Sequence, residues 1–197
     1  MENNFLEKNR KKVFGGAAVL AGVLFLVWVL VKPQKLPAEF LEARRAASLA
    51  SQEIVDLTDA TSQKIKEVDL SNPNLENTLR VIKEARDSNN EAYDKAFGLS
   101  RHLQKMAELF GKIRAKESRE LAYQAVSLEL GLISELISYT ERMNRFLENL
   151  AELAKTQSRE SLKATNEYLL EVNQKAAVIN KLNKEFTEKM KAFDESF

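Results

Sequence analysis

The chain has 197 residues, with 30 Lys and Arg against 29 Asp and Glu, and its formal net charge of +1 provides no overall field that would attract nucleic acid. It contains no Cys and a single His, which excludes disulfides, thiolate catalysis and the usual Cys or multi-imidazole metal sites. With only six Gly and three Pro to interrupt helices, we predict an all-α protein. We expect no cofactor, no metal, no nucleic-acid partner and no small-molecule substrate.

The strongest signal lies near the N-terminus. Residues 13–31, from Val13 to Val31, form a stretch of 19 residues without a charge, and Trp28 lies near its end. As a helix this stretch would be roughly 28 Å long, close to the thickness of the hydrocarbon core of a bilayer. A cleaved signal peptide is the alternative, but its apolar region is typically about 7 to 15 residues long and ends in a small-residue cleavage site. We therefore predict a retained transmembrane anchor.

The flanking charges predict the orientation of this anchor. Residues 1–12 contain four basic residues close to the anchor, whereas only Lys32 and Lys35 follow it directly, although Arg44 and Arg45 reduce the contrast. Because basic flanks remain on the cytoplasmic side, residues 1–12 are expected to be a cytoplasmic tail. Residues 32–37 would be a linker, and residues 38–197 an extracytoplasmic domain. The predicted location is the cell membrane, with a single pass.

Two small residues within the anchor, Ala18 and Gly22, are four positions apart. This spacing allows two membrane helices to approach closely, so the pair is a candidate for helix pairing in the membrane. The same spacing is common in apolar helices, and an unpaired anchor remains the alternative.

After the linker, apolar residues recur every seven positions, as in helices that pack in a coiled-coil manner. The clearest series is Ile82, Asn89, Ala96, Leu103 and Phe110. Polar interruptions divide the pattern into helices at about 37–68, 74–113, 118–154 and 158–196, which are similar in length and joined by short turns. We predict an antiparallel four-helix bundle with heptad packing. A continuous helix through the polar segment 114–120 is the alternative there.

Two amides occupy positions of the heptad pattern that should face the core. Asn89 and Asn183 each lie in an otherwise apolar series. A buried amide lowers stability unless it finds a partner, and a paired amide can define the register of neighbouring helices. The alternative is that one of them lines a cavity for a small ligand.

The segment 121–140 is unusually apolar, with Glu129 and Glu135 as its only charges. Three of its residues add a second apolar face beside the heptad series: Leu130, Ile133 and Ile137. A helix that is apolar on two sides needs two neighbours, so this face is a candidate interface with another molecule. Burial within the bundle is the alternative. A second membrane span is disfavoured because two central carboxylates are costly in a bilayer.

Near the C-terminus, Phe193 and Phe197 belong to an apolar stripe with lysines around it. Aromatic rings flanked by lysines suit the boundary of a bilayer, and the up-down-up-down order would return this end to the membrane. The same stripe could equally close the end of the bundle.

No motif indicates catalysis. The chain contains neither a phosphate-binding glycine loop nor a hydrolase or zinc-protease signature, and His102 has no identifiable catalytic partner in the sequence. We therefore expect a non-enzymatic membrane protein that acts as a scaffold, tether or accessory subunit of a membrane complex. Its expected partners are the membrane and a helical protein, or a second copy of itself. The alternatives are a ligand-sensing bundle that signals laterally to a membrane partner, and a lysis or membrane-remodelling protein.

Overall fold

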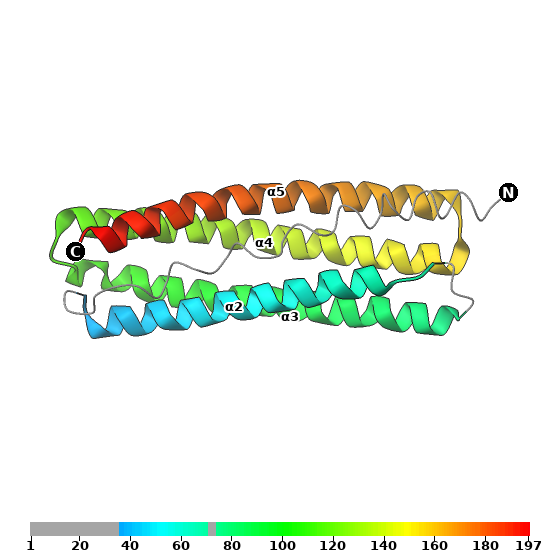
Figure 1. The fold of residues 1–197 in the computed structure, drawn as a ribbon, viewed down its shortest axis with the longest axis horizontal. Coiled ribbons are helices and arrows are strands. Elements are labelled where there is room, and N and C mark those ends of the chain that lie inside the picture. Colours follow the sequence, from blue (N-terminus) through cyan, green and yellow to red (C-terminus); the bar gives the residue numbers. More distant parts are fainter. Residues whose placement is uncertain (1–35, 71–73) are drawn as a thin grey trace.

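The computed structural model describes residues 36–70 and 74–197. Four long helices pack side by side along one axis: α2 (Ala38–Glu67), α3 (Leu75–Leu109), α4 (Lys116–Thr156) and α5 (Arg159–Glu195) (Figure 1). One short 3-10 turn, η1 (Phe110–Lys112), extends the end of α3. The prediction of an all-helical chain with four helices packed together is confirmed for this part of the chain.

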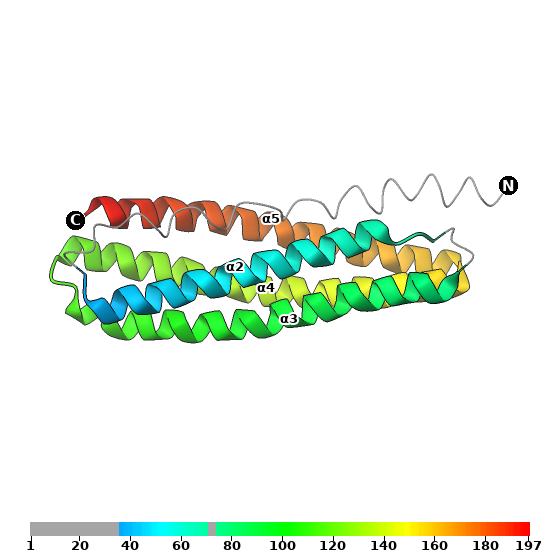
Figure 2. The ribbon, with the colours of Figure 1, turned by 60° about the horizontal axis from the view of Figure 1, so that its bottom comes forward.

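Successive helices run in opposite directions, as the colours along the ribbon show in both views (Figures 1 and 2). The beginning of α2, the α3–α4 turn and the end of α5 therefore lie together, at what we call the proximal end. The α2–α3 and α4–α5 turns lie together at the other end, the distal end. The C-terminus thus lies beside the start of α2, although the two are far apart in sequence.

The helix boundaries follow from local chemistry. The α2 helix begins directly after Pro37, whose fixed φ suits a helix start. Asn74 caps α3 by accepting the Asn77 N–H at 3.1 Å, and Ser158 caps α5 by accepting the Ser161 N–H at 3.1 Å. These caps satisfy backbone donors that have no partner within the helix.

Two short connections reverse the chain on either side of α4. Ile113 and Ala115 have extended backbone angles, so α3 and α4 are separate helices and not one continuous helix. At the other end of α4, Gln157 adopts a left-handed conformation with φ of 48°, the geometry with which many helices end. All four helices begin and end within a few residues of the ranges expected from the heptad pattern.

The core runs the length of the bundle and contains residues from every helix. Its largest fully buried side chains are Phe40, Phe110, Phe146, Phe193, Ile54, Ile65, Leu103, Met106, Ile113, Met143, Leu147 and Leu150. Most of them lie at positions that recur every three or four residues along their helices. Burial of this one apolar stripe per helix is the main force that holds the four helices together.

The predicted anchor lies outside the described residues, and so do Val13, Trp28 and Val31 and the pairing candidates Ala18 and Gly22. Within residues 36–70 and 74–197, none of the helices combines the length and the apolarity that crossing a bilayer requires. The second-span alternative for segment 121–140 therefore receives no support.

Candidate functional site

Asn89 joins α3 to α4 through its side-chain amide. Its Nδ2 donates to the carbonyl oxygen of Thr140 at 2.8 Å and to Oδ1 of Asn144 at 2.9 Å. Asn144 in turn donates to Oδ1 of Asn90 at 2.8 Å. Asn89 is 2% exposed and its bond to Thr140 is buried, so water cannot compete for that bond, whereas the bond between Asn144 and Asn90 is exposed. This is the cross-bundle pairing that the sequence suggested, and it ties the two helices at a defined register.

Asn183 on α5 is in a different situation. Its side chain is 1% exposed, and neither its Nδ2 nor its Oδ1 has a hydrogen-bond partner. A buried amide without partners is costly, because it has given up hydrogen bonds to water and gained none in exchange. Asn183 therefore requires an explanation that Asn89 does not.

A small cavity in the middle of the bundle contains this amide. The cavity has a volume of about 10 Å³, which is room for about one water molecule. All four helices contribute to its lining, which consists of Ser51, Ile54, Leu99, Glu129, Leu132, Leu136, Asn183 and Phe186. The cavity is far below the roughly 300 Å³ of a typical organic-ligand pocket. It can hold only a very small molecule.

The same cavity is lined by a buried carboxyl, that of Glu129, which is 4% exposed. Ser51 donates to its Oε1 at 3.4 Å, while its Oε2 has no hydrogen-bond partner. Burial raises the pKa of Glu129 to about 8, although the Ser51 hydrogen bond and the positive charge of Arg44 act in the opposite direction. At neutral pH Glu129 is therefore predominantly protonated and uncharged.

Sequence reasoning noted the charge of Glu129 but did not place it in the core. The signal was present, because Glu129 is four residues after Ala125 and three before Leu132, and both of these lie in the heptad series. Arg44 and Ser51 were missed for a related reason. They are seven residues apart on α2 and are both buried, but their polarity removed them from an apolar pattern.

At the proximal end, the rings of Phe193 and Phe197 belong to the bundle. Phe193 is 0% exposed, with its ring centroid 6.0 Å from that of Phe40 and 5.2 Å from that of Phe197. Next to this cluster, the guanidinium of Arg44 makes two bonds to the carboxylate of Asp194, at 2.8 and 2.9 Å. In the folded bundle the ring of Phe193 is covered by protein and that of Phe197 is half-buried against the core, which favours the alternative that these rings close the end of the bundle.

The second apolar face of α4 is divided between core and surface. Ile133 is 4% exposed and belongs to the core, and Ile137 is half-buried against it. Leu130 is 44% exposed. Of the three residues considered for an interface, Ile133 is thus used inside the bundle, and Leu130 is the one that a second molecule could reach most easily.

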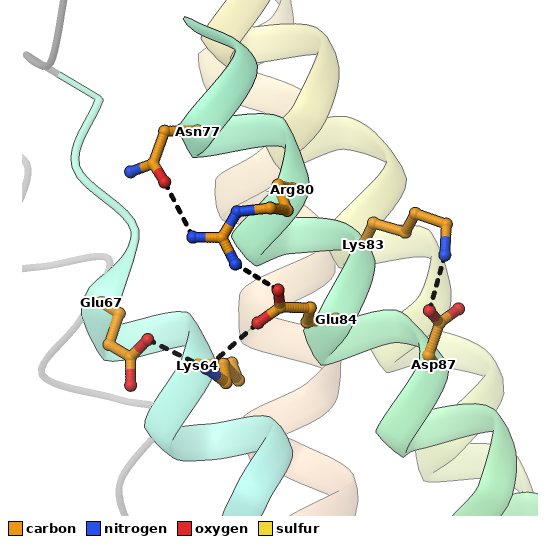
Figure 3. Close-up of polar contacts among 7 residues, drawn as sticks. All are labelled: Lys64, Glu67, Asn77, Arg80, Lys83, Glu84 and Asp87. Carbon is orange, nitrogen blue, oxygen red and sulfur yellow. Dashed lines mark hydrogen bonds and ion pairs between the residues drawn. The ribbon is translucent and has the colours of Figure 1, made fainter. Parts of the chain in front are cut away.

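Charged side chains on the outside of the bundle pair with one another. At the distal end Lys64 of α2 contacts Glu84 of α3 at 3.1 Å, and Arg80 contacts the same carboxylate (Figure 3). Lys83 and Asp87 pair along α3 at 2.8 Å. Hydrogen bonding to Glu84 raises the pKa of Lys64. Of these exposed pairs only Lys64–Glu84 joins α2 to α3, and such pairs contribute little to stability.

Two open grooves of about 530 and 500 Å³ flank α4, and Arg142 lines both. Arg86 and Arg145 each contact Glu148, at 2.7 and 3.3 Å, and Arg142 contacts Glu171 at 3.0 Å. Because each of these guanidinium groups already faces a carboxylate, the grooves do not offer the unopposed positive charge that an anion site needs.

The described residues contain no group of three or more His, Asp or Glu side chains that could hold a metal ion. His102 is half-buried on α3. Comparison with known proteins finds no matching family model, no matching curated protein and no matching solved structure. On chemical grounds alone, the small and mainly apolar cavity that Glu129 and Asn183 line is the strongest candidate site within the described residues.

Proposed function

We propose that this chain is a non-enzymatic, single-pass membrane protein whose extracytoplasmic bundle serves as a scaffold, tether or accessory subunit of a membrane complex. The observation that carries the proposal is the closure of the proximal end. Phe193 packs on Phe40 and Asp194 holds Arg44, so the last turns of α5 are joined to the first turns of α2. An anchor at residues 13–31 would lead directly into this joined end.

The remainder of the bundle would then project away from the bilayer. The longest helix, α4, has 41 residues, and at about 1.5 Å per residue the bundle is roughly 60 Å long. A rod of this length with a filled core suits a spacer that positions the distal turns away from the membrane. The same geometry gives partners a long lateral surface along which helices can align.

One strip of that surface suits a helical partner. Tyr123 and Leu130 are seven residues apart on α4 and are 52% and 44% exposed. Ser127 lies between them and Gly131 follows, and a Cβ added at Gly131 would meet nothing within 4 Å. These four residues are uncharged, and two of them are small, so another helix can approach this face of α4 closely. We propose this strip as the contact with a helical protein or with a second copy of the chain.

The membrane topology can be tested with single cysteines, because the chain has none. Asn4→Cys probes the tail, and Glu76→Cys probes an exposed site at the distal end without removing the Asn74 cap of α3. In intact cells we expect an impermeant maleimide to label position 76 and not position 4. Labelling of position 4 alone would place the bundle in the cytoplasm and contradict the proposal.

The contact strip has its own test. We expect Leu130→Glu to abolish co-purification of a stoichiometric partner, or self-association, from detergent-solubilised membranes. Leu170→Glu is the matched control, because Leu170 is 59% exposed on a different helix, α5. Equal effects of both variants, or no effect of Leu130→Glu, would reject this surface.

The alternative of a ligand-sensing bundle is not favoured by the size of the core cavity. Its 10 Å³ would have to expand many-fold before an organic ligand could enter. A lysis or membrane-remodelling role predicts that expression damages the cell envelope. No feature of the described residues favours that role over a scaffold.

A further inference from the structure

Three buried polar atoms without partners belong to residues that line the same cavity. They are Oε2 of Glu129 on α4 and both Oδ1 and Nδ2 of Asn183 on α5. Ser51 on α2 lines the cavity as well, and its hydroxyl already bonds Oε1 of Glu129. Unsatisfied polar atoms concentrated around one space indicate that the space holds a hydrogen-bonding molecule.

The surroundings of the Glu129 carboxyl in this cavity are mainly apolar. The other lining residues are Ile54, Leu99, Leu132, Leu136 and Phe186, which are all apolar. An ionised carboxylate in such surroundings is costly unless a cation pairs with it.

Glu129 is the only titratable group among the lining residues from the four helices. The positive charge of Arg44 on α2 acts on Glu129, but the guanidinium of Arg44 makes two bonds to Asp194. Without a dedicated cation, the carboxyl is more stable with a proton.

We propose that the space between Ser51, Glu129 and Asn183 is a binding site for one small neutral hydrogen-bonding molecule, namely water, held by the protonated form of Glu129. The protonated carboxyl provides a donor, the Asn183 Oδ1 an acceptor and the Asn183 Nδ2 a further donor. A water molecule with two to four polar partners can satisfy all of them at once. The site would link α4 to α5 much as Asn89 links α3 to α4, with solvent in place of a protein acceptor.

A bound metal cation is the competing occupant, and the lining does not suit it. Hard cations take about six or more oxygen ligands, whereas this lining supplies oxygens from three side chains and is otherwise apolar. The N–H groups of Asn183 would also face the cation with the wrong polarity. The lining therefore favours a neutral occupant.

The first test measures the proton on Glu129 in the full-length chain in detergent micelles. At about pH 6, exposed carboxyls are ionised, so the infrared C=O band of a protonated carboxylic acid should report Glu129. We expect this band in the wild-type protein, its loss in Glu129→Gln and its persistence in Glu120→Gln, a control at an exposed position of α4. Absence of the band from the wild-type protein would overturn the proposal, and this outcome needs no variant to fold.

The second test identifies the occupant. In the same full-length sample, we expect the side-chain amide protons of Asn183 to show a nuclear Overhauser effect to water. Asn89 is the internal control, because its amide already donates to Thr140 and Asn144 and should show none. A result in which neither amide contacts water would overturn the assignment of the occupant.

A third test asks whether a metal cation occupies the site, by replacing sodium with choline at constant ionic strength in the same full-length sample. We expect the melting temperature to be the same in both salts. Specific stabilisation by sodium, together with an ionised Glu129, would show that the site binds a metal cation and not water.

Discussion

Buried ionisable groups at the proximal end and in the middle of the bundle are accommodated in two different ways. At the proximal end Arg44 is 3% exposed, and Asp194 meets its charge with two short bonds. In the middle Glu129 is 4% exposed, its Oε2 has no protein partner, and burial raises its pKa to about 8. The charge of the first group is paired with a carboxylate from another helix, while the second group is kept neutral by a proton. One core thus contains two ways of burying an ionisable group: pairing it with a group of opposite charge, or neutralising it with a proton.

The largest expected effect is a pH dependence that originates in the middle of the bundle. The folded pKa of Glu129, about 8, lies above its ordinary value of 4.5, so the folded state binds more protons between these values. Stability from this group is complete below about pH 4.5 and is lost as the pH rises through about 8. At about 1.4 kcal/mol per pH unit, the loss over this window is on the order of 5 kcal/mol. Urea unfolding followed by circular dichroism at a series of pH values measures it.

The matched variants for this experiment are Glu129→Gln and Glu120→Gln. Glu129→Gln should flatten the profile between about pH 5.5 and about pH 8, because the titrating group is gone. Glu120→Gln, at an exposed position, should leave the profile unchanged. If the free energies of unfolding of the wild-type protein and of Glu129→Gln depend on pH in the same way, Glu129 does not hold a proton in the folded state.

At the proximal end, removing the partner should be costly at every pH in this range. Asp194→Asn removes the charge of the carboxylate to which the buried guanidinium of Arg44 makes two bonds, and we expect a loss of about 3 kcal/mol in the free energy of unfolding. Asp87→Asn is the control, because Asp87 is 59% exposed and pairs with Lys83 on the surface. A loss for Asp194→Asn no larger than that of the control would mean that the buried pair is not an anchor point between α2 and α5.

A smaller effect should separate the two core amides. Asn89→Ala removes two hydrogen bonds to protein, at 2.8 and 2.9 Å, and should cost about 2 kcal/mol. Asn183→Ala removes none to protein and should cost less than about 1 kcal/mol, because solvent can fill the enlarged space. Equal losses in urea unfolding would show that Asn183 is bonded as firmly as Asn89.

The smallest effect belongs to the surface. Lys83→Ala breaks an exposed pair within α3, and we expect no change in melting temperature beyond the error of the measurement, since solvent screens such pairs. A clear decrease would indicate that the distal charges in Figure 3 act as a coupled network.

Much of the fold could be predicted because heptad periodicity is a local property of the chain. The spacing of Phe40, Ala47 and Ile54 indicates a helix with one buried face, and all three are buried. Asn74 and Ser158 identify helix starts because a capping side chain bonds backbone only three residues away. The helix order and the antiparallel arrangement follow from similar helix lengths and short turns.

The sequence by itself determined the helical class, the number of described helices and their approximate boundaries, because those depend on interactions between residues a few positions apart. Only the tertiary structure decided which groups the polar residues at core positions contact. Asn89 and Asn183 have the same side chain at equivalent positions of the pattern, yet one faces Thr140 and Asn144 and the other a cavity beside Glu129. Which polar group lies opposite another depends on the relative rotation and register of helices far apart in sequence, and heptad spacing along a single helix carries no information about either.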